Sequence, residues 1–272
     1  MQNWALPRFA RSGFPPFRYR YIPTLWWFRY AMLLNHHRFG TPIGAATIPS
    51  ALVFWRIMNI EAVIFDFDGT LYDMKGFAKK LILSSLRDIF IMGAERKIRR
   101  ELRGKDFGNA EALKNEMISK IAEKSRKSEQ KIRTWYENRY VQNMCRVLSK
   151  HYRVRSEVPE LFASLHEKEI KIAIFSDYPI VRERMSAIGL GKEAQNLCEK
   201  IYSAQDFGAL KPAPRPFLEI AAALNTKSEN CLVVGDRCDT DGEGARLSGM
   251  SFFQIKNDKD FQSLFTIGFQ PF

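Results

Sequence analysis

The feature of this chain that most restricts its fold is a regular alternation of short apolar runs with longer segments of helical periodicity, starting at Ile60. The short runs suit buried strands, whereas the longer segments repeat their apolar residues every three or four positions, as amphipathic helices do. Parallel strands joined by right-handed helical crossovers place helices on both faces of a sheet. We therefore predict an α/β fold with a doubly wound parallel sheet.

The alternation also gives approximate bounds for each element. Strands are predicted at 60–66, 170–176, 199–203 and 230–235, with a fifth candidate at 251–255. Helices are predicted between them at 158–168, 179–189, 214–224 and 240–248. The segment after Lys256 carries no pattern from which chemistry can be predicted.

A long insert separates the first two predicted strands. Segment 76–158 contains no proline, and a strand-to-helix connection normally needs only about two to six residues. Its apolar residues recur at helical spacing, beginning with Leu81, Leu83, Leu86, Ile89 and Phe90. We predict that 76–158 forms an inserted all-helical cap, and that 58–75 and 159–272 together form a Rossmann-like core.

The first 57 residues differ from the rest of the chain. They contain seven Arg and no Asp, Glu or Lys, and they show neither helical nor strand periodicity. The longest uncharged run, Phe39 to Trp55, is interrupted by two prolines and is shorter than the roughly 20 apolar residues of a membrane span. Segment 1–57 is therefore expected to be either upstream sequence before a true start at Met58, rather than Met1, or an organellar or membrane-surface leader.

The net charge of +12 is concentrated in two segments. Segment 1–57 carries +7 and segment 76–158 carries +11, which leaves −6 for the remainder. A non-catalytic nucleic-acid-binding protein would explain this basicity, but not the acidic residues described below, so no nucleic-acid partner is expected. The four cysteines form no disulfide or zinc pattern, which favours the cytoplasm, unless 1–57 directs the protein to an organelle or a membrane surface.

Polar residues occur at the carboxyl ends of the predicted strands, where parallel sheets collect their working groups. These residues are Asp66 and Asp68 after the first strand, Ser176 after the second, Lys211 in a loop after the third, and Asp236 and Asp241 after the fourth. Carboxylates suit a hard cation, whereas a hydroxyl and an ammonium group suit phosphate oxygens. Their order predicts one site for phosphoryl chemistry.

Segments 60–73, 170–177, 208–214 and 232–241 resemble, in order and context, the four motifs of the haloacid dehalogenase (HAD) superfamily. The DxDGTL form of the first motif, followed by a helical insert, is similar to the phosphoglycolate-phosphatase and β-phosphoglucomutase branch. The resemblance extends from Met58 to about Lys256 and does not include 1–57. It is specific for mechanism and much less so for substrate.

The resemblance implies a role for each acidic residue of the first motif. Asp66 would attack phosphorus and form an aspartyl-phosphate, and Asp68 would act as the general acid and then as the general base. Mg²⁺ would be held by the carboxylates of Asp66 and Asp236 and by the backbone carbonyl of Asp68. Branches that dehalogenate carbon substrates lack the second Asp, so Asp68 favours phosphoryl chemistry.

The remaining motif residues would bind phosphate or support the metal. Ser176 and Lys211 would hold the phosphoryl oxygens, and Asp241 would orient a metal-bound water, with Asp239 as the competing candidate. The substrate is expected to be a small phosphorylated metabolite, and a phosphomutase remains the alternative to a phosphatase. The oligomeric state is not predicted. Basic clusters of the cap, such as 96–100 and 124–127, are either solvated helix faces or an attraction for additional anionic groups of the substrate.

Overall fold

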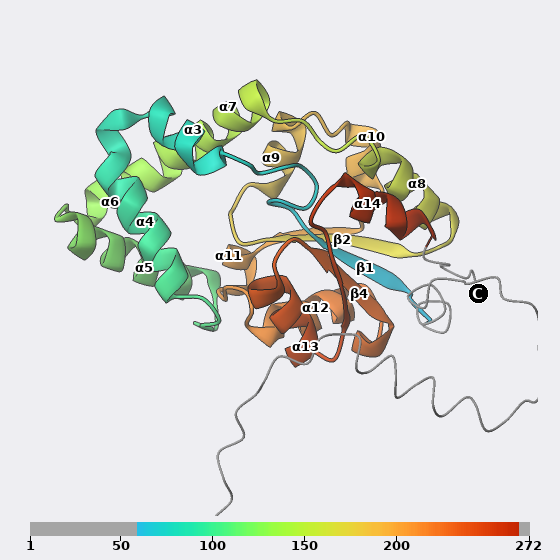
Figure 1. Cartoon of the computed structure of the whole chain (residues 1–272). Helices are drawn as coiled ribbons and strands as arrows, with labels where there is room; N and C mark the ends of the chain where they lie inside the picture. The colour runs from blue at the N-terminus through green and yellow to red at the C-terminus, as the bar shows by residue number, and fades with distance from the viewer. Residues whose placement is uncertain (1–58, 267–272) are drawn as a thin grey trace, which may run out of the picture. The chain divides into compact units, whose positions relative to one another are not determined.

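The computed structural model describes residues 59–266, so the segment 1–57 lies outside the described residues. Five parallel strands form one sheet in the order β3-β2-β1-β4-β5 (Figure 1). The strands are β1 (Ala62–Asp66), β2 (Lys171–Ser176), β3 (Lys200–Ser203), β4 (Cys231–Gly235) and β5 (Ser251–Gln254). The predicted α/β class and doubly wound parallel sheet are thus confirmed, with strand bounds that differ from the predicted ones by one or two residues.

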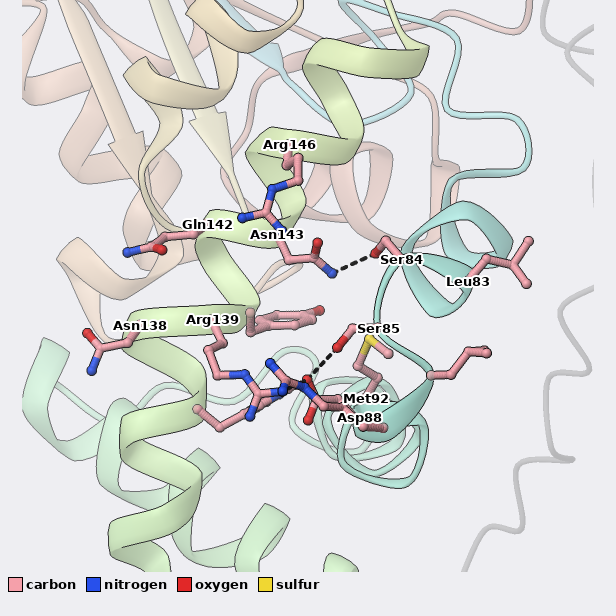
Figure 2. A pocket seen from close by; sticks show the side chains of 14 residues that line it. Leu83, Ser84, Ser85, Asp88, Met92, Asn138, Arg139, Gln142, Asn143 and Arg146 are labelled. Atoms are coloured by element: carbon pink, nitrogen blue, oxygen red, sulfur yellow. Dashed lines mark hydrogen bonds and ion pairs between the residues drawn. The ribbon is translucent and has the colours of Figure 1, made fainter.

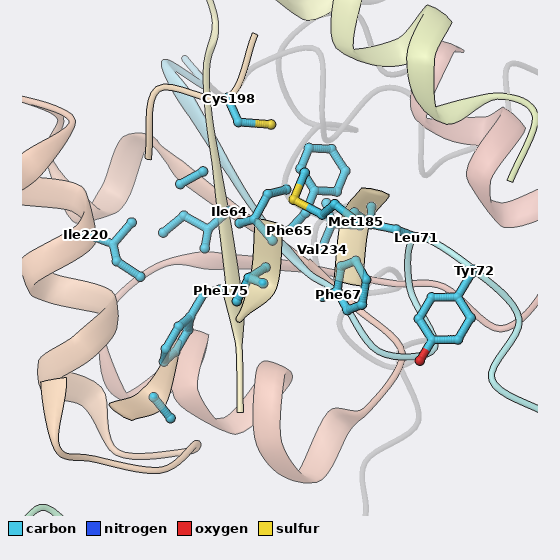
Figure 3. Packing of buried hydrophobic residues seen from close by; sticks show 14 of the residues in the cluster. Ile64, Phe65, Phe67, Leu71, Tyr72, Phe175, Met185, Cys198, Ile220 and Val234 are labelled. Atoms are coloured by element: carbon cyan, nitrogen blue, oxygen red, sulfur yellow. The ribbon is translucent and has the colours of Figure 1, made fainter. Parts of the chain in front are cut away.

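Helices cover the two faces of the sheet. They are α8 (Val158–Glu167), α9 (Val181–Ala187), α10 (Lys192–Asn196), α11 (Ala204–Phe207), α12 (Pro214–Ala223), α13 (Glu243–Leu247) and α14 (Asp258–Thr266). The ring of Phe65 lies 5.2 Å from Phe162 of α8, whereas Phe175 on the neighbouring strand lies 5.2 Å from Phe217 of α12. Because side chains alternate along a strand and Phe175 is in register with Asp66, these two contacts lie in opposite apolar layers of the core. Phe65 and Phe175 are labelled among the buried residues in Figure 3.

The insert between β1 and β2 is helical. It contains α3 (Phe77–Ser84), the short turn η1 (Leu86–Asp88), α4 (Ile89–Glu101), α5 (Ala110–Ser125), α6 (Glu129–Trp135), the π-helical turn η2 (Tyr136–Tyr140) and α7 (Val141–His151). We refer to these elements as the cap. No helix within residues 59–266 combines the length and apolar character that a membrane span requires.

The first apolar residues of the cap recur at helical spacing, but they do not form one buried face. Leu81 is buried, whereas Leu83, Leu86, Ile89 and Phe90 are 61, 62, 40 and 82 % exposed. The reason is a break in the helix, because α3 ends at Ser84 and α4 begins only at Ile89. Residues on the two sides of the break belong to different helices, so their spacing in sequence does not place them on one face.

Candidate active site

Asp66 ends β1 at the carboxyl edge of the sheet, and it is 7 % exposed. One carboxylate oxygen, Oδ2, accepts a hydrogen bond of 2.9 Å from the hydroxyl of Thr70. The other, Oδ1, lies 2.7 Å from Nζ of Lys211. Both oxygens of Asp66 are therefore held by side chains from the loops that follow β1 and β3.

Lys211 connects three carboxylates at this edge. Its Nζ donates to Asp66 and also to Oδ1 of Asp241 at 2.7 Å, while its backbone N–H donates to Oδ1 of Asp177 at 3.2 Å. Burial alone would lower the pKa of Lys211, but Asp241 and Asp66 raise it above the ordinary value of a lysine. The structure thus holds a buried ammonium group beside Asp66.

Three carboxylates converge where β1 and β4 end. One oxygen each from Asp66, Asp236 and Asp241 lies within 4.8 Å of the others. The loop after β1 approaches Asp236 closely, since a Cβ built on Gly69 would lie 2.4 Å from Oδ2 of that residue. Gly69 also has φ +92°, a conformation that residues with a side chain rarely adopt. Glycine at this position allows the two motifs to meet.

This group of carboxylates fits a hard divalent cation. Burial, followed by repulsion from Asp241, raises the pKa of Asp236 to about 6. Burial also raises the pKa of Asp66 well above its usual range, and Asp241 and Asp236 add to the shift against the opposing effect of Lys211. A site that disfavours its own negative charges in this way would be stabilised by a cation, and oxygen donors are the ligands that Mg²⁺ prefers.

Asp239 lies apart from this group. Its side chain is 62 % exposed and pairs with Arg237 and with Arg103 of the cap. The π-helical turn η4 (Cys238–Gly242) turns Asp241 inward, where it is 1 % exposed, and Asp239 outward. Of the two acidic residues left open by the sequence, Asp241 is the one beside Asp66.

Asp68 points to a different set of partners. Its Oδ1 accepts from the hydroxyl of Tyr72 at 2.8 Å, and its Oδ2 accepts from the hydroxyl of Ser176 at 2.9 Å. Nη1 of Arg184 donates to both oxygens, at 2.8 and 2.7 Å. The carboxylate of Asp68 is thus satisfied on both oxygens by neighbouring side chains.

Arg184 is a residue of this candidate site that the sequence analysis did not identify. It is fully buried, and its Nη2 donates to Oγ of Ser176 at 2.6 Å and to the carbonyl of Tyr178 at 2.9 Å. Burial alone would lower the pKa of Arg184, but Asp68 raises it. A signal was present, because Arg184 lies between Val181 and Met185 on the buried stripe of α9.

Ser176 occupies the end of β2 and is fully buried. Its hydroxyl donates to Asp68, while the same oxygen accepts from Arg184 and, at 3.2 Å, from the backbone N–H of Tyr178. These bonds link the ends of β1 and β2. In this structure the hydroxyl of Ser176 is therefore engaged with Asp68 and Arg184.

The cap reaches this edge of the sheet through Arg99. Its Nη1 donates to the carbonyl of Asp177 at 2.8 Å, and its Nε donates to Glu95 at 2.7 Å. The basic cluster 96–100 is therefore not uniform. Arg99 is buried and paired, whereas Arg96, Lys97 and Arg100 are exposed.

The chain was compared with known protein families and with individual known proteins. A sequence model of the haloacid dehalogenase-like hydrolases matches residues 60–249. The chain is 26 % identical over 207 residues to a glyceraldehyde 3-phosphate phosphatase from Methanopyrus kandleri, covering 74 % of this chain and 85 % of that protein. It is 25 % identical over 192 residues to a phosphoglycolate phosphatase from Aquifex aeolicus, covering 70 % and 82 %.

Solved structures share the fold. A β-phosphoglucomutase from Clostridium difficile matches with a TM-score of 0.52 at 21 % identity, covering 75 % of this chain and 87 % of that one. A predicted phosphoglycolate phosphatase from Haemophilus somnus matches with a TM-score of 0.50 at 18 % identity, covering 74 % and 87 %. The resemblance inferred from the four sequence motifs is confirmed.

Proposed function

Because the chain belongs to the haloacid dehalogenase-like hydrolase family, we propose that it is a Mg²⁺-dependent phosphatase that hydrolyses the monoester of a small phosphorylated metabolite through a phosphoryl group carried on Asp66. Two of the relatives that it matches are named as phosphatases of such metabolites. The observation that carries the proposal is the convergence of Asp66, Lys211 and two further carboxylates at one edge of the sheet.

Asp66 is the proposed nucleophile. Its carboxylate would form a bond to phosphorus while the bond from phosphorus to the ester oxygen breaks, which divides one hard hydrolysis into two displacements. Water would then attack the same phosphorus, releasing inorganic phosphate and restoring Asp66. Lys211, whose ammonium group lies 2.7 Å from Asp66, would stabilise the negative charge of the transferring phosphoryl group.

Asp68 is the proposed proton carrier. It would give a proton to the departing alcohol oxygen and later accept one from the attacking water, so that protons balance over the two steps. Each of its oxygens now accepts two hydrogen bonds, so proton transfer requires that one of these partners is released. Arg184 and Ser176 would set the direction in which the carboxylate turns.

The carboxylates of Asp66 and Asp236 would hold Mg²⁺, together with the backbone carbonyl of Asp68. Bound Mg²⁺ would offset the repulsion between the phosphate ester and the acidic site. Asp241, which also pairs with Lys211, would orient a metal-bound water.

A phosphomutase is the second candidate function, because the β-phosphoglucomutase structure shares this fold. Both reactions use the same nucleophile and differ only in whether water or a second hydroxyl group receives the phosphoryl group. The amount of inorganic phosphate released for each ester consumed distinguishes them.

The test is hydrolysis of p-nitrophenyl phosphate by the full chain, with and without Mg²⁺. Activity should require the metal and should fall to background in Asp66→Asn, which preserves shape but removes the nucleophilic oxygen. Asp239→Asn is the matched control, since the same change is made in an exposed carboxylate. Undiminished turnover by Asp66→Asn would contradict the proposed mechanism.

A further inference from the structure

A hollow lies wholly within the cap, between the end of α3 with η1 on one side and η2 with α7 on the other (Figure 2). Its volume is about 520 Å³, within the roughly 300–1,000 Å³ of small-molecule pockets. All of its lining residues belong to the cap, and none of them is among the residues described above for the candidate active site. We call this hollow the cap groove.

The cap groove and the candidate active site lie at different positions along helix α4. Met92 of α4 lines the groove, whereas Arg99 of the same helix contacts Asp177. These two residues are separated by about two helical turns, or roughly 10 Å along the helix axis. The groove is therefore distinct from the position where Asp66 would meet a phosphate.

Unpaired positive charge lines the groove. Of its three arginines, Arg139 is paired with the buried carboxylate of Asp88, which also accepts a 2.6 Å hydrogen bond from Ser85. Arg87 and Arg146 are exposed, and within residues 59–266 their guanidinium groups have no hydrogen-bond or ion-pair partner. Two free guanidinium groups beside one hollow favour an anionic ligand.

Asn143 adds a hydrogen-bond acceptor. Its Nδ2 donates to Oγ of Ser84 at 2.6 Å, and Ser84 in turn donates its only hydroxyl hydrogen to the carbonyl of Leu81 at 2.6 Å. Ser84 can therefore only accept from Asn143, which fixes the orientation of the amide. Oδ1 of Asn143 is left as the one buried side-chain nitrogen or oxygen atom in the described part of the chain without a partner.

A buried acceptor without a donor is unfavourable, so a ligand that supplies an O–H group would gain from reaching it. The atom is shielded from solvent in this conformation, so the side chains that cover it must shift before a ligand can reach it. The side chain of Asn143 extends from α7 toward Ser84 across the groove (Figure 2). Met92 and Trp135, both buried, supply an apolar wall for a short carbon skeleton.

We propose that the cap groove binds a small hydroxylated anion at a site separate from the active site. Arg146 and Arg87 hold its carboxylate or phosphate group, and its hydroxyl group donates to Oδ1 of Asn143. The carboxylate and phosphate forms share this chemistry, so the test includes one probe of each kind with a counterpart that lacks the hydroxyl groups.

The test is calorimetric titration of the full chain carrying Asp66→Asn, which prevents turnover of phosphate esters. The probes are malate against succinate, and glycerol 3-phosphate against propyl phosphate. At least one hydroxylated probe should bind, and Arg146→Gln should weaken it about tenfold, as loss of one charge-assisted contact implies. Arg96→Gln is the matched control, since Arg96 is an exposed cap arginine outside the groove.

Asn143→Leu tests the acceptor. This near-isosteric change should reduce the ratio of the two affinities, that of the hydroxylated probe to that of its counterpart, to about one. If Asn143→Leu does not fold, the proposal is still tested by Arg146→Gln. That variant should fold, because Arg146 is exposed and unpaired.

Three results would overturn the proposal. One is that neither hydroxylated probe binds. Another is that a hydroxylated probe binds with equal affinity to the chain with an unsubstituted groove, to Arg146→Gln and to Arg96→Gln. The third is competitive inhibition of p-nitrophenyl phosphate hydrolysis by malate that Arg146→Gln relieves, because the groove would then be part of the substrate path.

Discussion

Replacing the buried Arg184 of α9 with methionine should destabilise the fold far more than the same replacement of an exposed arginine on that helix. Arg184 is fully buried, and it holds Asp68 through two hydrogen bonds of 2.8 and 2.7 Å. Its other bonds reach Ser176 and the carbonyls of Tyr178 and Pro179. Methionine fills a similar volume but donates none of these bonds.

The expected loss follows from the burial of the pair. Removing one member of a buried ion pair costs about 3–5 kcal/mol, because the remaining charge is left without compensation. A domain of this kind has a total stability of roughly 5–15 kcal/mol, so the loss is a large fraction of it. The free energy of unfolding, measured by urea denaturation of the full chain followed by circular dichroism, should fall by that amount.

A double-mutant cycle separates the ion pair from general loss of packing. Asp68→Asn removes the charge that Arg184→Met leaves unpaired, so the double variant should be more stable than the sum of the two single losses implies. Arg182→Met is the control, since Arg182 is exposed on the same helix. A loss below about 1 kcal/mol for Arg184→Met, or strict additivity with Asp68→Asn, would refute this account of Arg184.

Three further predictions concern the metal site and the chain boundary. Asp236→Asn should raise the Mg²⁺ concentration needed for half-maximal activity at least about tenfold, equivalent to about 1.4 kcal/mol of binding, while the circular dichroism spectrum stays unchanged; an unaltered metal titration would remove Asp236 from the site. Gly69→Ala should weaken Mg²⁺ binding and destabilise the fold by more than about 1 kcal/mol, because its Cβ would meet Asp236 at 2.4 Å; normal metal affinity and stability in that variant would contradict the close approach. A chain that starts at Met58 should fold and keep its phosphatase activity, because the five-stranded sheet, the cap and the proposed site residues all lie after Met58; an inactive or unfolded product would show that segment 1–57 is required.

The core could be predicted from sequence because its elements are local and regular. Each apolar run became a strand of the sheet, and the residues at their carboxyl ends lie close together because parallel strands end at one edge. The short helices α10 and α11 and the terminal helix α14 were not predicted. The first two have only five and four residues, too few to display a helical period.

The cap was harder to predict, because apolar spacing alone does not reveal where a helix stops. Nothing between Leu81 and Phe90 is a proline or glycine, so the sequence reads as one continuous helix. The chain instead changes direction at Ser85, which leaves Phe90 82 % exposed. The break depends on how α3 and α4 pack on the rest of the cap, and that packing involves residues distant in sequence.

The buried charged residues are easier to predict than the helix break in the cap and harder than the strands. The sequence predicts which charged residues are buried, but it does not always predict their partners. Arg184 in α9, and Glu95 and Arg99 in α4, each occur on the apolar stripe of their own helix. A charge on such a stripe must be paired, since an isolated buried charge is far too costly, so the pattern predicts that a partner exists. Glu95 and Arg99 are four residues apart and find each other on one helix turn, as the sequence could have indicated. Arg184 instead pairs with Asp68, a residue 116 positions away, and only the tertiary fold, which places α9 beside the loop after β1, brings them together.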